Sequence, residues 1–291
     1  MKEFIQGQKR FFFNYLSGAI QYLRARYILP MFADVLIISH PKAGRTWIRV
    51  ILHEIFKIQT GQHEYMFRNL WTSSYEFFEM SRQNNQIPKI LFTHLRSDGL
   101  CWLKSRDRIR SIDNKKVVLL VRDPRDIMVS YYFQLTRRAK SHVVSGMSLP
   151  QFLRSDYLHN LINFMNAMER SRHSHRNTLL IKYEDLHRDT IGEVDRLIRF
   201  MDFQVTNEVL EKAVAFGTFE NMHEMERRGL YAKKRRGEVA HVLETWDVHD
   251  RDAYKVRKGK VGGYVDYLGD DDIHYLNSEI QKRLDPSFGY G

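Results

Sequence analysis

Cysteine and long apolar runs are both scarce in this sequence, and each shortage excludes a class of protein. A single cysteine, Cys101, among 291 residues cannot form an intramolecular disulfide and indicates a reducing compartment. The longest apolar stretch, residues 27–39, is interrupted by Pro30 and Asp34 and is too short to span a bilayer. Residues 1–13 lack the apolar core followed by small residues that is typical of a secretory signal. We therefore predict a cytoplasmic protein with no stable membrane insertion.

Acidic residues are too few to balance the basic ones. The 46 lysines and arginines exceed the 35 aspartates and glutamates, which gives a formal net charge of +11. This excess indicates an anionic partner, and a nucleic acid, a membrane surface and a polyanionic small molecule all fit it. The basic residues are scattered apart from residues 233–236, and no zinc-spaced motif, basic zipper or RRM signature accompanies them. Charge alone leaves the partner open.

Short, nearly continuous apolar runs alternate with segments of helical periodicity. Such runs are typical of strands buried on both faces of a parallel sheet. Four are present, at residues 35–39, 89–93, 116–121 and 178–183. Helical patterns follow the first run and recur at residues 124–139, 150–172, 189–201 and 206–215. The order predicts an α/β fold in which helices flank one central parallel sheet.

The helical pattern after the first run has an apolar and a polar face. The apolar face carries Ile48, Ile51, Leu52 and Ile55, and the pattern assigns Arg49, His53 and Lys57 to the opposite face.

The sequence predicts one main domain, residues 34–291, with two segments outside its regular plan. Residues 1–33 form a basic amphipathic extension, which fits either a helix packed on the domain or a membrane contact. Residues 224–256 are charged and only weakly periodic. A segment of that length in a compact domain is typical of a lid or a mobile loop.

The loop after the first predicted strand resembles a phosphate-binding loop with a displaced lysine. Residues 38–47 read ISHPKAGRTW, so Lys42 precedes Gly44, whereas the lysine of a nucleotide triphosphatase loop follows the last glycine. In open α/β sheets ligands bind beyond the carboxyl ends of the strands, and the amides of residues 43–47 would face an anion there. Taken alone, the loop fits an ordinary strand-to-helix turn equally well.

Two further loops are cationic. Arg122 directly follows the third strand and Ser130 lies two helical turns beyond it, so a guanidinium fork and a hydroxyl can bind one phosphate. A structural ion pair between Arg122 and Asp126 is the alternative. The third loop, RKGKVGGY at residues 257–264, combines basic residues with glycine and is weak evidence by itself.

In this order, the three loops resemble those of the cytosolic-type sulfotransferases, which use 3′-phosphoadenosine 5′-phosphosulfate (PAPS). PKAGRTW is similar to the 5′-phosphosulfate loop PKSGTTW, Arg122 and Ser130 match the 3′-phosphate loop, and RKGKVGGY resembles RKGxxGDW. The resemblance runs from about residue 34 to the C-terminus, and the ending LDPSFGYG is closest in character to bacterial members. It implies a P-loop-like sulfotransferase fold.

The resemblance also implies three catalytic groups. His94, in PKILFTHL at residues 88–95, corresponds to the general base. Lys42 corresponds to the group that stabilises the leaving phosphate, and Ser130 to one that binds the 3′-phosphate and holds Lys42 until the acceptor binds.

Donor binding is implied at a larger set of positions, in which Trp47, Tyr183 and Phe219 surround the adenine. The full set is Lys42, Ala43, Gly44, Arg45, Thr46, Trp47, Arg122, Ser130, Tyr183, Thr218, Phe219, Arg257, Lys258 and Gly259.

Several positions depart from the family pattern. Phe92 replaces the lysine two residues before the histidine, and Arg96 replaces a proline. Gly217 replaces the threonine that begins the adenine stretch, and GGY at residues 262–264 replaces GDW. The Lys-Thr-Val-Glu dimer signature of animal members is absent. Acceptor identity and oligomeric state therefore stay open.

The implied reaction is transfer of a sulfuryl group from PAPS to a hydroxyl or amine of a small-molecule acceptor, with adenosine 3′,5′-bisphosphate (PAP) as product. All the implied cations are side chains, so we expect no metal, and we expect no nucleic-acid partner. Two other classes remain as alternatives. A nucleotide kinase with a degenerate loop would need Asp123 as a magnesium ligand, and a basic nucleic-acid- or membrane-binding module would leave His94 and the three-loop order unexplained.

Overall fold

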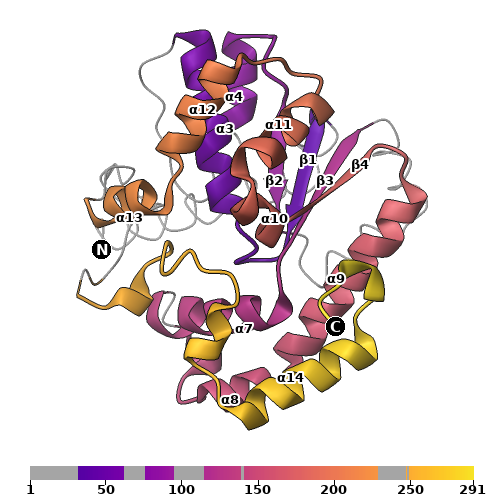
Figure 1. The fold of residues 1–291 in the computed structure, drawn as a ribbon, viewed down its shortest axis with the longest axis vertical. Helices are drawn as coiled ribbons and strands as arrows, with labels where there is room; N and C mark the ends of the chain where they lie inside the picture. Colours follow the sequence, from indigo (N-terminus) through magenta and orange to yellow (C-terminus); the bar gives the residue numbers. More distant parts are fainter. Residues whose placement is uncertain (1–31, 62–75, 95–114, 139–140, 229–246, 248) are drawn as a thin grey trace, which may run out of the picture.

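A computed structural model describes residues 32–61, 76–94, 115–138, 141–228, 247 and 249–291 of the chain (Figure 1). Its sheet has four parallel strands in the order β2-β1-β3-β4. The strands are β1 (Val35–Ser39), β2 (Ile90–Thr93), β3 (Lys116–Val121) and β4 (Thr178–Lys182). These bounds confirm the four predicted strands to within one residue at each end. All five β1 residues are buried, as expected for a continuous apolar run at the centre of a sheet.

Helices cover both faces of the sheet, and Figure 1 shows α3, α11 and α12 on one side of it and α9 on the other. The α-helices are α3 (Arg45–Thr60), α4 (Glu76–Gln83), α7 (Pro124–Phe133), α8 (Leu149–Leu153), α9 (Asp156–Ser174), α10 (Tyr183–Arg188), α11 (Thr190–Phe200), α12 (Asn207–Phe216), α13 (Phe219–Arg227) and α14 (Asp270–Arg283). A π-helical turn, η4 (Gln134–Arg138), continues α7, and short 3₁₀ turns are η5 (His142–Val144), η6 (Arg251–Ala253), η7 (Gly263–Asp266) and η8 (Pro286–Phe288). The predicted parallel α/β fold is confirmed.

The predicted helix over residues 150–172 is two helices in the structure. Helix α8 ends at Leu153, and Ser155 then caps α9 by accepting a hydrogen bond from the amide of Tyr157. Serine is a strongly preferred N-cap residue, because its hydroxyl satisfies an amide that the first turn leaves without a partner. The local capping signal therefore divides an otherwise continuous apolar pattern.

The prediction that Arg49 and His53 lie on a polar face of the first helix was wrong. Their exposed fractions are only 4% and 2%. Helix α3 is covered on a second side by α12, and Val50 packs against Met222 and Met225 of α13. A single-helix periodicity assigns one buried face and cannot show that another helix covers the other.

None of the helices in the described ranges has the length and apolar character needed to cross a bilayer.

The C-terminal residues tie the ends of β3 and β4 together. The half-buried carboxylate of Glu184 accepts hydrogen bonds from the amide of Asp123 at 2.9 Å and the hydroxyl of Tyr290 at 2.7 Å. Arg125 donates to the Tyr290 carbonyl at 3.2 Å and is paired with Asp123. Because Asp123 directly follows Arg122, these bonds fix the turn on which Arg122 is carried.

Tyr290→Phe should lower the free energy of unfolding by about 1–3 kcal/mol, because the half-buried Glu184 carboxylate loses a hydrogen bond. Urea unfolding checks this through the transition midpoint at constant slope. The matched control is Tyr275→Phe on α14, since no hydrogen bond joins the Tyr275 hydroxyl to a described residue. Equal midpoints for the two variants would show that the Tyr290–Glu184 bond does not stabilise the chain.

Candidate active site

The loop between β1 and α3 contains two residues with positive φ. Lys42 has a φ of 75° and Gly44 a φ of 95°. Glycine adopts this region freely, but a side chain there costs about 1–3 kcal/mol and persists only where the surroundings impose it. The backbone at Lys42 is therefore held in a conformation that a free loop would leave.

Backbone amides at the start of α3 form a potential anion site. The amides of Ala43 and Trp47 donate hydrogen bonds to the carbonyls of His40 and Gly44 within the loop. Those of Gly44, Arg45 and Thr46 have no hydrogen-bond partner within the described part of the chain. They stand at a helix N-terminus, where the helix dipole favours negative charge. Of the five amides predicted to face an anion, those of residues 43–47, three are thus left for one, and anion binding at this loop stays a prediction.

Gly44 lets an aromatic side chain from another strand end lie against the loop. A Cβ atom on Gly44 would be 2.7 Å from Cδ2 of Tyr183, the residue that follows β4. The rings of Trp47 and Tyr183 meet edge to face with centroids 5.7 Å apart, and His187 lies 6.1 Å from Trp47. The structure brings the predicted residues Trp47 and Tyr183 together and adds His187, which the sequence analysis missed.

Arg122 connects the three predicted loops. Its guanidinium carbon lies 4.2 Å from the Tyr183 ring centroid, and its terminal nitrogens donate to the carbonyls of Lys42 at 3.4 Å and Lys260 at 2.9 Å. The ion pair with Asp126, considered above as the alternative, is present at 3.1 Å. The Arg122 Nε atom is buried without a hydrogen-bond partner within the described residues. A structural ion pair and a position beside the anion site therefore coexist.

Asp126 also holds the third loop. Its buried carboxylate accepts the backbone amides of Gly262 at 2.9 Å and Tyr264 at 3.0 Å. Both amides lie in the glycine-containing part of RKGKVGGY, so one carboxylate on α7 fixes the loop after β3 and the loop near the C-terminus relative to each other.

Arg257 and Lys258 have different surroundings. The Arg257 guanidinium lies over the rings of Phe133 and Tyr267, at 4.6 Å and 4.7 Å from their centroids. Lys258 is exposed and paired with Asp266 at 3.0 Å. Arg257 is thus more enclosed by the protein than Lys258, and a donor contact of either residue stays a prediction.

Phe219 lies against Gly259. Gly259 has a φ of 58°, and a Cβ there would be 2.3 Å from Cδ2 of Phe219, so glycine is required for this approach. Thr218 is exposed and caps α13 by accepting the amide of Asn221. Phe219 and Gly259, two predicted contacts 40 positions apart in the sequence, are thus neighbours.

His94 directly follows β2, and its ring is oriented by β1. Its Nδ1 atom lies 2.8 Å from the carbonyl oxygen of Ser39. A carbonyl only accepts, so Nδ1 carries the proton and Nε2 carries the lone pair in the neutral ring. Burial, followed by the charge of Arg45, lowers the pKa of His94 well below its usual 6.5. The imidazole is therefore neutral near pH 7, as a general base must be.

Lys42 meets Gln134 rather than Ser130. Its ammonium lies 3.5 Å from Oε1 of Gln134, in the π-helical turn one helical turn beyond Ser130. The expected Lys42–Ser130 contact is replaced by one to a longer side chain on the same part of the helix. Burial, followed by the charge of Arg138, lowers the pKa of Lys42 from 10.5 to about 7. A role for Ser130 in phosphate binding stays a prediction.

Three charged residues near these groups were missed by the sequence analysis. Glu226 on α13 is 1% exposed and lies 3.8 Å from Arg138, and its charge acts to raise the pKa of Lys42. The charge of Lys255, two residues before Arg257, acts on His94. Lys255 lies two residues before the RKGK motif and Glu226 seven residues after Phe219, but both fell inside the segment assigned to a lid.

Parts of the predicted organisation lie outside the described residues. These are residues 1–31 of the extension, Arg96, and residues 229–246 and 248 of the predicted lid. The ends of the lid segment are described: Glu224–Arg227 complete α13, and residues 249–256 include η6. A lid function stays a prediction.

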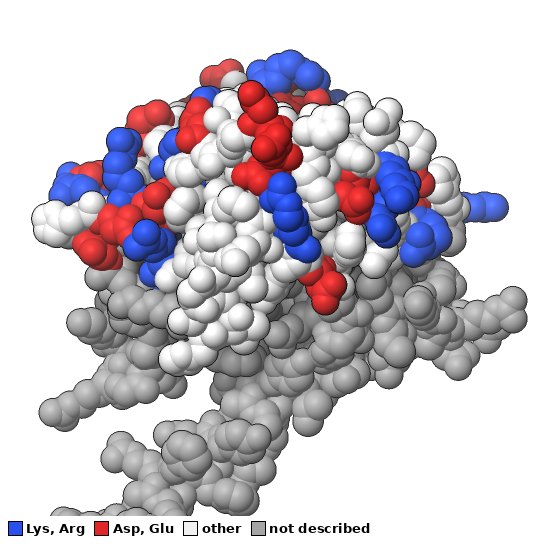
Figure 2. Space-filling view, turned by 90° about the horizontal axis from the view of Figure 1, so that it is seen from below, with Lys and Arg blue, Asp and Glu red and all other residues white. Residues whose placement is uncertain are grey.

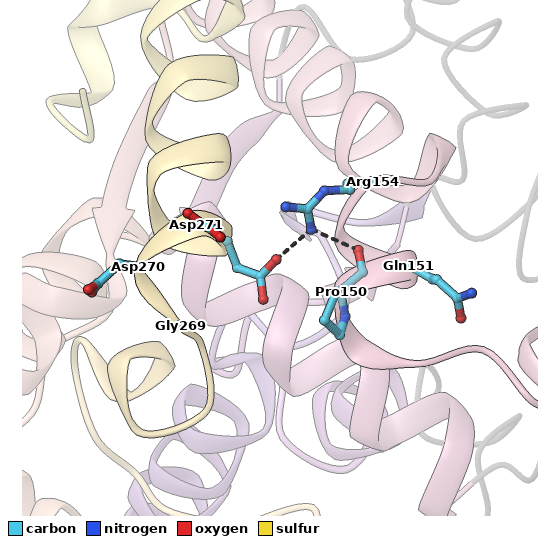
Figure 3. A pocket seen from close by; sticks show the side chains of 7 residues that line it. Pro150, Gln151, Arg154, Gly269, Asp270 and Asp271 are labelled. Atoms are coloured by element: carbon cyan, nitrogen blue, oxygen red, sulfur yellow. Dashed lines mark hydrogen bonds and ion pairs between the residues drawn. The ribbon is translucent and has the colours of Figure 1, made fainter.

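An open hollow of about 650 Å³ lies away from the predicted residues, between the N-termini of α8 and α14 (Figure 3). Arg154 crosses it, donating to the Pro150 carbonyl and pairing with Asp272. On the face that Figure 2 shows, basic and acidic side chains are interspersed, so the net positive charge forms no continuous basic surface there. Neither feature suggests a second anion site.

The fold and the loops together define an α/β protein with a P-loop-like loop at the carboxyl end of a parallel sheet. Residues 32–288 match the family model for the sulfotransferase domain, and the chain belongs to this family of enzymes. The match confirms the resemblance on which the sequence analysis relied.

Similar proteins come from plants and animals. Flavonol 3-sulfotransferase of Flaveria bidentis is 24% identical over 86% of this chain and 81% of its own length. Sulfotransferase 2A1 of Rattus norvegicus is 26% identical over 79% of this chain and 85% of its own length. The crystal structure of mouse sulfotransferase SULT7A1 complexed with PAP superposes with a TM-score of 0.61 at 18% identity, over 86% of this chain and 84% of that one. The crystal structure of retinol dehydratase in complex with androsterone and PAP superposes with a TM-score of 0.59 at 17% identity, over 87% of this chain and 80% of that one.

Gly44→Ala should weaken PAP binding by at least about tenfold, because the new methyl group displaces Tyr183 and strains the loop. The matched control is Gly61→Ala: Gly61 also has a positive φ, of 64°, but an added Cβ there meets no atom of the described residues within 4 Å. Calorimetric titration with PAP and the melting temperature check both variants. An equal loss of affinity in the two would mean that the contact with Tyr183 is irrelevant to the nucleotide site.

Proposed function

We propose that this chain transfers the sulfuryl group of PAPS to a hydroxyl or amine of a small-molecule acceptor and releases PAP. The observation that carries the proposal is the meeting of four loops at one edge of the sheet. The residues that follow the four strand ends include Lys42, His94, Arg122 and Tyr183, and each has a place in this reaction.

The donor would be held by three groups of contacts. The amides of Gly44, Arg45 and Thr46 bind the 5′-phosphosulfate at the start of α3. Arg122, with Ser130 and Arg257, binds the 3′-phosphate by charge-assisted hydrogen bonds. The adenine lies among the aromatic side chains of Trp47, Tyr183 and Phe219, which is supported by the contacts of Tyr183 with Gly44 and of Phe219 with Gly259.

In the chemical step, the acceptor oxygen or nitrogen attacks sulfur in line while its proton passes to Nε2 of His94. The new bond to sulfur forms as the bond between sulfur and the bridging phosphate oxygen breaks. PAP departs with the electron pair, and the Lys42 ammonium stabilises the charge that grows on that oxygen. The bond from His94 to Ser39 supports this role, because it leaves Nε2 as the proton acceptor.

The kinase alternative is disfavoured by the surroundings of Asp123. Its carboxylate accepts from the amide of Arg125 and is paired with the Arg125 guanidinium at 2.7 Å. A magnesium ligand in that position would have to break both interactions. Nucleotide phosphorylation therefore has no suitable acidic ligand at this strand end.

PAP should raise the melting temperature clearly, and adenosine 5′-monophosphate should raise it much less. Ligand at about 100 times its Kd stabilises the native state by about 2.7 kcal/mol. The monophosphate lacks the 3′-phosphate assigned to Arg122, so it loses those charged contacts. Thermal melts with each nucleotide at equal concentration measure the difference. The assignment of the 3′ site fails if both nucleotides stabilise the protein equally.

His94→Ala should lower turnover by about 10²–10⁴-fold and leave PAP affinity near its original value. Lys42→Ala should lose turnover and also bind PAP more weakly, because its ammonium faces the 5′-phosphate before reaction. The acceptor is found first by screening hydroxyl and amine compounds with sulfur-labelled PAPS. Near-normal turnover of His94→Ala with a good acceptor would remove His94 from the mechanism.

The pH dependence separates the two residues further. Lys42 acts in its protonated form and its pKa is lowered to about 7, so kcat/KM for PAPS should fall as the pH rises through about 7. In kcat this decline should move to higher pH, because the bound anion raises the pKa of the lysine. His94 stays neutral well below pH 6.5, so no acidic decline is expected near that pH. The alkaline decline should persist in His94→Ala and vanish in Lys42→Ala.

A further inference from the structure

Glu226 is a buried carboxylate whose hydrogen bonds are made with backbone amides. It is 1% exposed, and its two oxygens accept the amides of Lys255 at 2.7 Å and Val256 at 2.8 Å. These amides immediately precede Arg257. A buried carboxylate is costly unless its bonds are satisfied, so this arrangement fixes the backbone that leads into the RKGK loop.

Helix α13 holds the same segment at three successive points. Phe219 lies against Gly259, His223 lies 2.9 Å from the carbonyl of Val256, and Glu226 accepts the two amides. The three helix residues are spaced by four and three positions, so they share one face of α13. Helix α13 therefore supports residues 255–259 along one side.

Asp126 braces the other end of the loop. Its carboxylate accepts the amides of Gly262 and Tyr264, just as Glu226 accepts those of Lys255 and Val256. In the sequence, Arg257 lies between the amides that bind Glu226 and the amides that bind Asp126. Asp126 also binds Arg122, whereas Glu226 stands near Arg138 and Lys42.

Glu226 is also the acidic group in the charge environment of Lys42. Arg138 of η4, Arg257 and Arg122 each act to lower the pKa of Lys42, and Glu226 acts to raise it. Gln134, the hydrogen-bond partner of Lys42, is uncharged. Removing the carboxylate would leave the three arginine charges opposing the protonated lysine.

We propose that Glu226 is a positioning residue for the donor site: its two hydrogen bonds to backbone amides fix the segment that carries Arg257 against α13. The inference rests on the proposed function, since it assigns Arg257 and Lys42 to the donor nucleotide. It adds a residue that touches neither donor nor acceptor, and it acts through the two loops that do.

The test compares Glu226→Gln with Glu224→Gln in the full-length chain. The substitution is the same and both residues are on α13, but Glu224 pairs with Arg227 and Arg228 at the helix surface. A glutamine at 226 keeps one acceptor and loses the charge. We expect the ratio of PAP affinity to adenosine 5′-monophosphate affinity to fall at least about tenfold in Glu226→Gln and to stay unchanged in the control.

The pH profile provides the second readout. In Glu226→Gln the alkaline decline of kcat/KM for PAPS should move to lower pH, because Lys42 loses its neighbouring negative charge. A lower melting temperature with an unchanged affinity ratio and an unchanged pH profile would show a merely structural residue and overturn the inference. Failure of the original chain to bind PAP would instead overturn the proposed function.

If the Glu226→Gln variant does not fold, Glu226→Asp tests the same positioning role. The shorter side chain keeps the charge but cannot reach both amides in the same geometry, so the alkaline decline should stay in place while the affinity ratio falls. An aspartate variant with the original affinity ratio would contradict the positioning role of Glu226.

Discussion

The parallel pairing of β1 with β2 on one side and with β3 on the other places the loops that carry Lys42, His94 and Arg122 at one edge of the sheet. Ile38 pairs with Thr93, Ser39 with Leu120, and Val121 with Lys182, so the four strands end at nearly the same level. Parallel strands place their carboxyl ends at one edge, and the loops that follow are brought together without direct sequence proximity. The His94 bond to Ser39 is a direct product of this pairing, because the residue after β2 reaches a carbonyl at the end of β1.

Two buried carboxylates then organise the cationic loops. Asp126 and Glu226 each accept two backbone amides from the segment around the RKGK loop, and each stands beside an arginine. Cations gathered for an anionic donor repel one another in the free protein, and partly buried groups gain little screening from solvent. Carboxylates that bind both backbone and guanidinium groups reduce this repulsion while fixing geometry. Burial first, and then the charges of Arg138, Arg257 and Arg122, lower the pKa of Lys42 to about 7, and the charge of Glu226 opposes this shift.

Close approach through glycine is the second recurring device. Gly44 admits the Tyr183 ring and Gly259 admits Phe219, in each case with positive φ and with no room for a Cβ atom. Gly44 lies in the motif PKAGRTW and Gly259 in the motif RKGKVGGY, so the sequence alone could assign both glycines to predicted binding loops. Which aromatic ring fills the space is a property of the fold, since Tyr183 and Phe219 come from other parts of the chain.

The sequence by itself determined the four strands and the parallel α/β class, and it supplied the loops and residues that we propose for the donor. Local signals carry that information, because apolar runs, glycine positions and motif order are read from neighbouring residues. Only the tertiary structure decided that Arg49 and His53 are buried, that Lys42 meets Gln134 rather than Ser130, and that Glu226, Arg138 and Lys255 belong to the site. Each of these depends on a second element packing against the first: α12 and α13 cover α3, η4 displaces the lysine contact by one turn, and α13 holds the segment before Arg257. Such contacts join residues far apart in the chain, and periodicity within one element does not encode them.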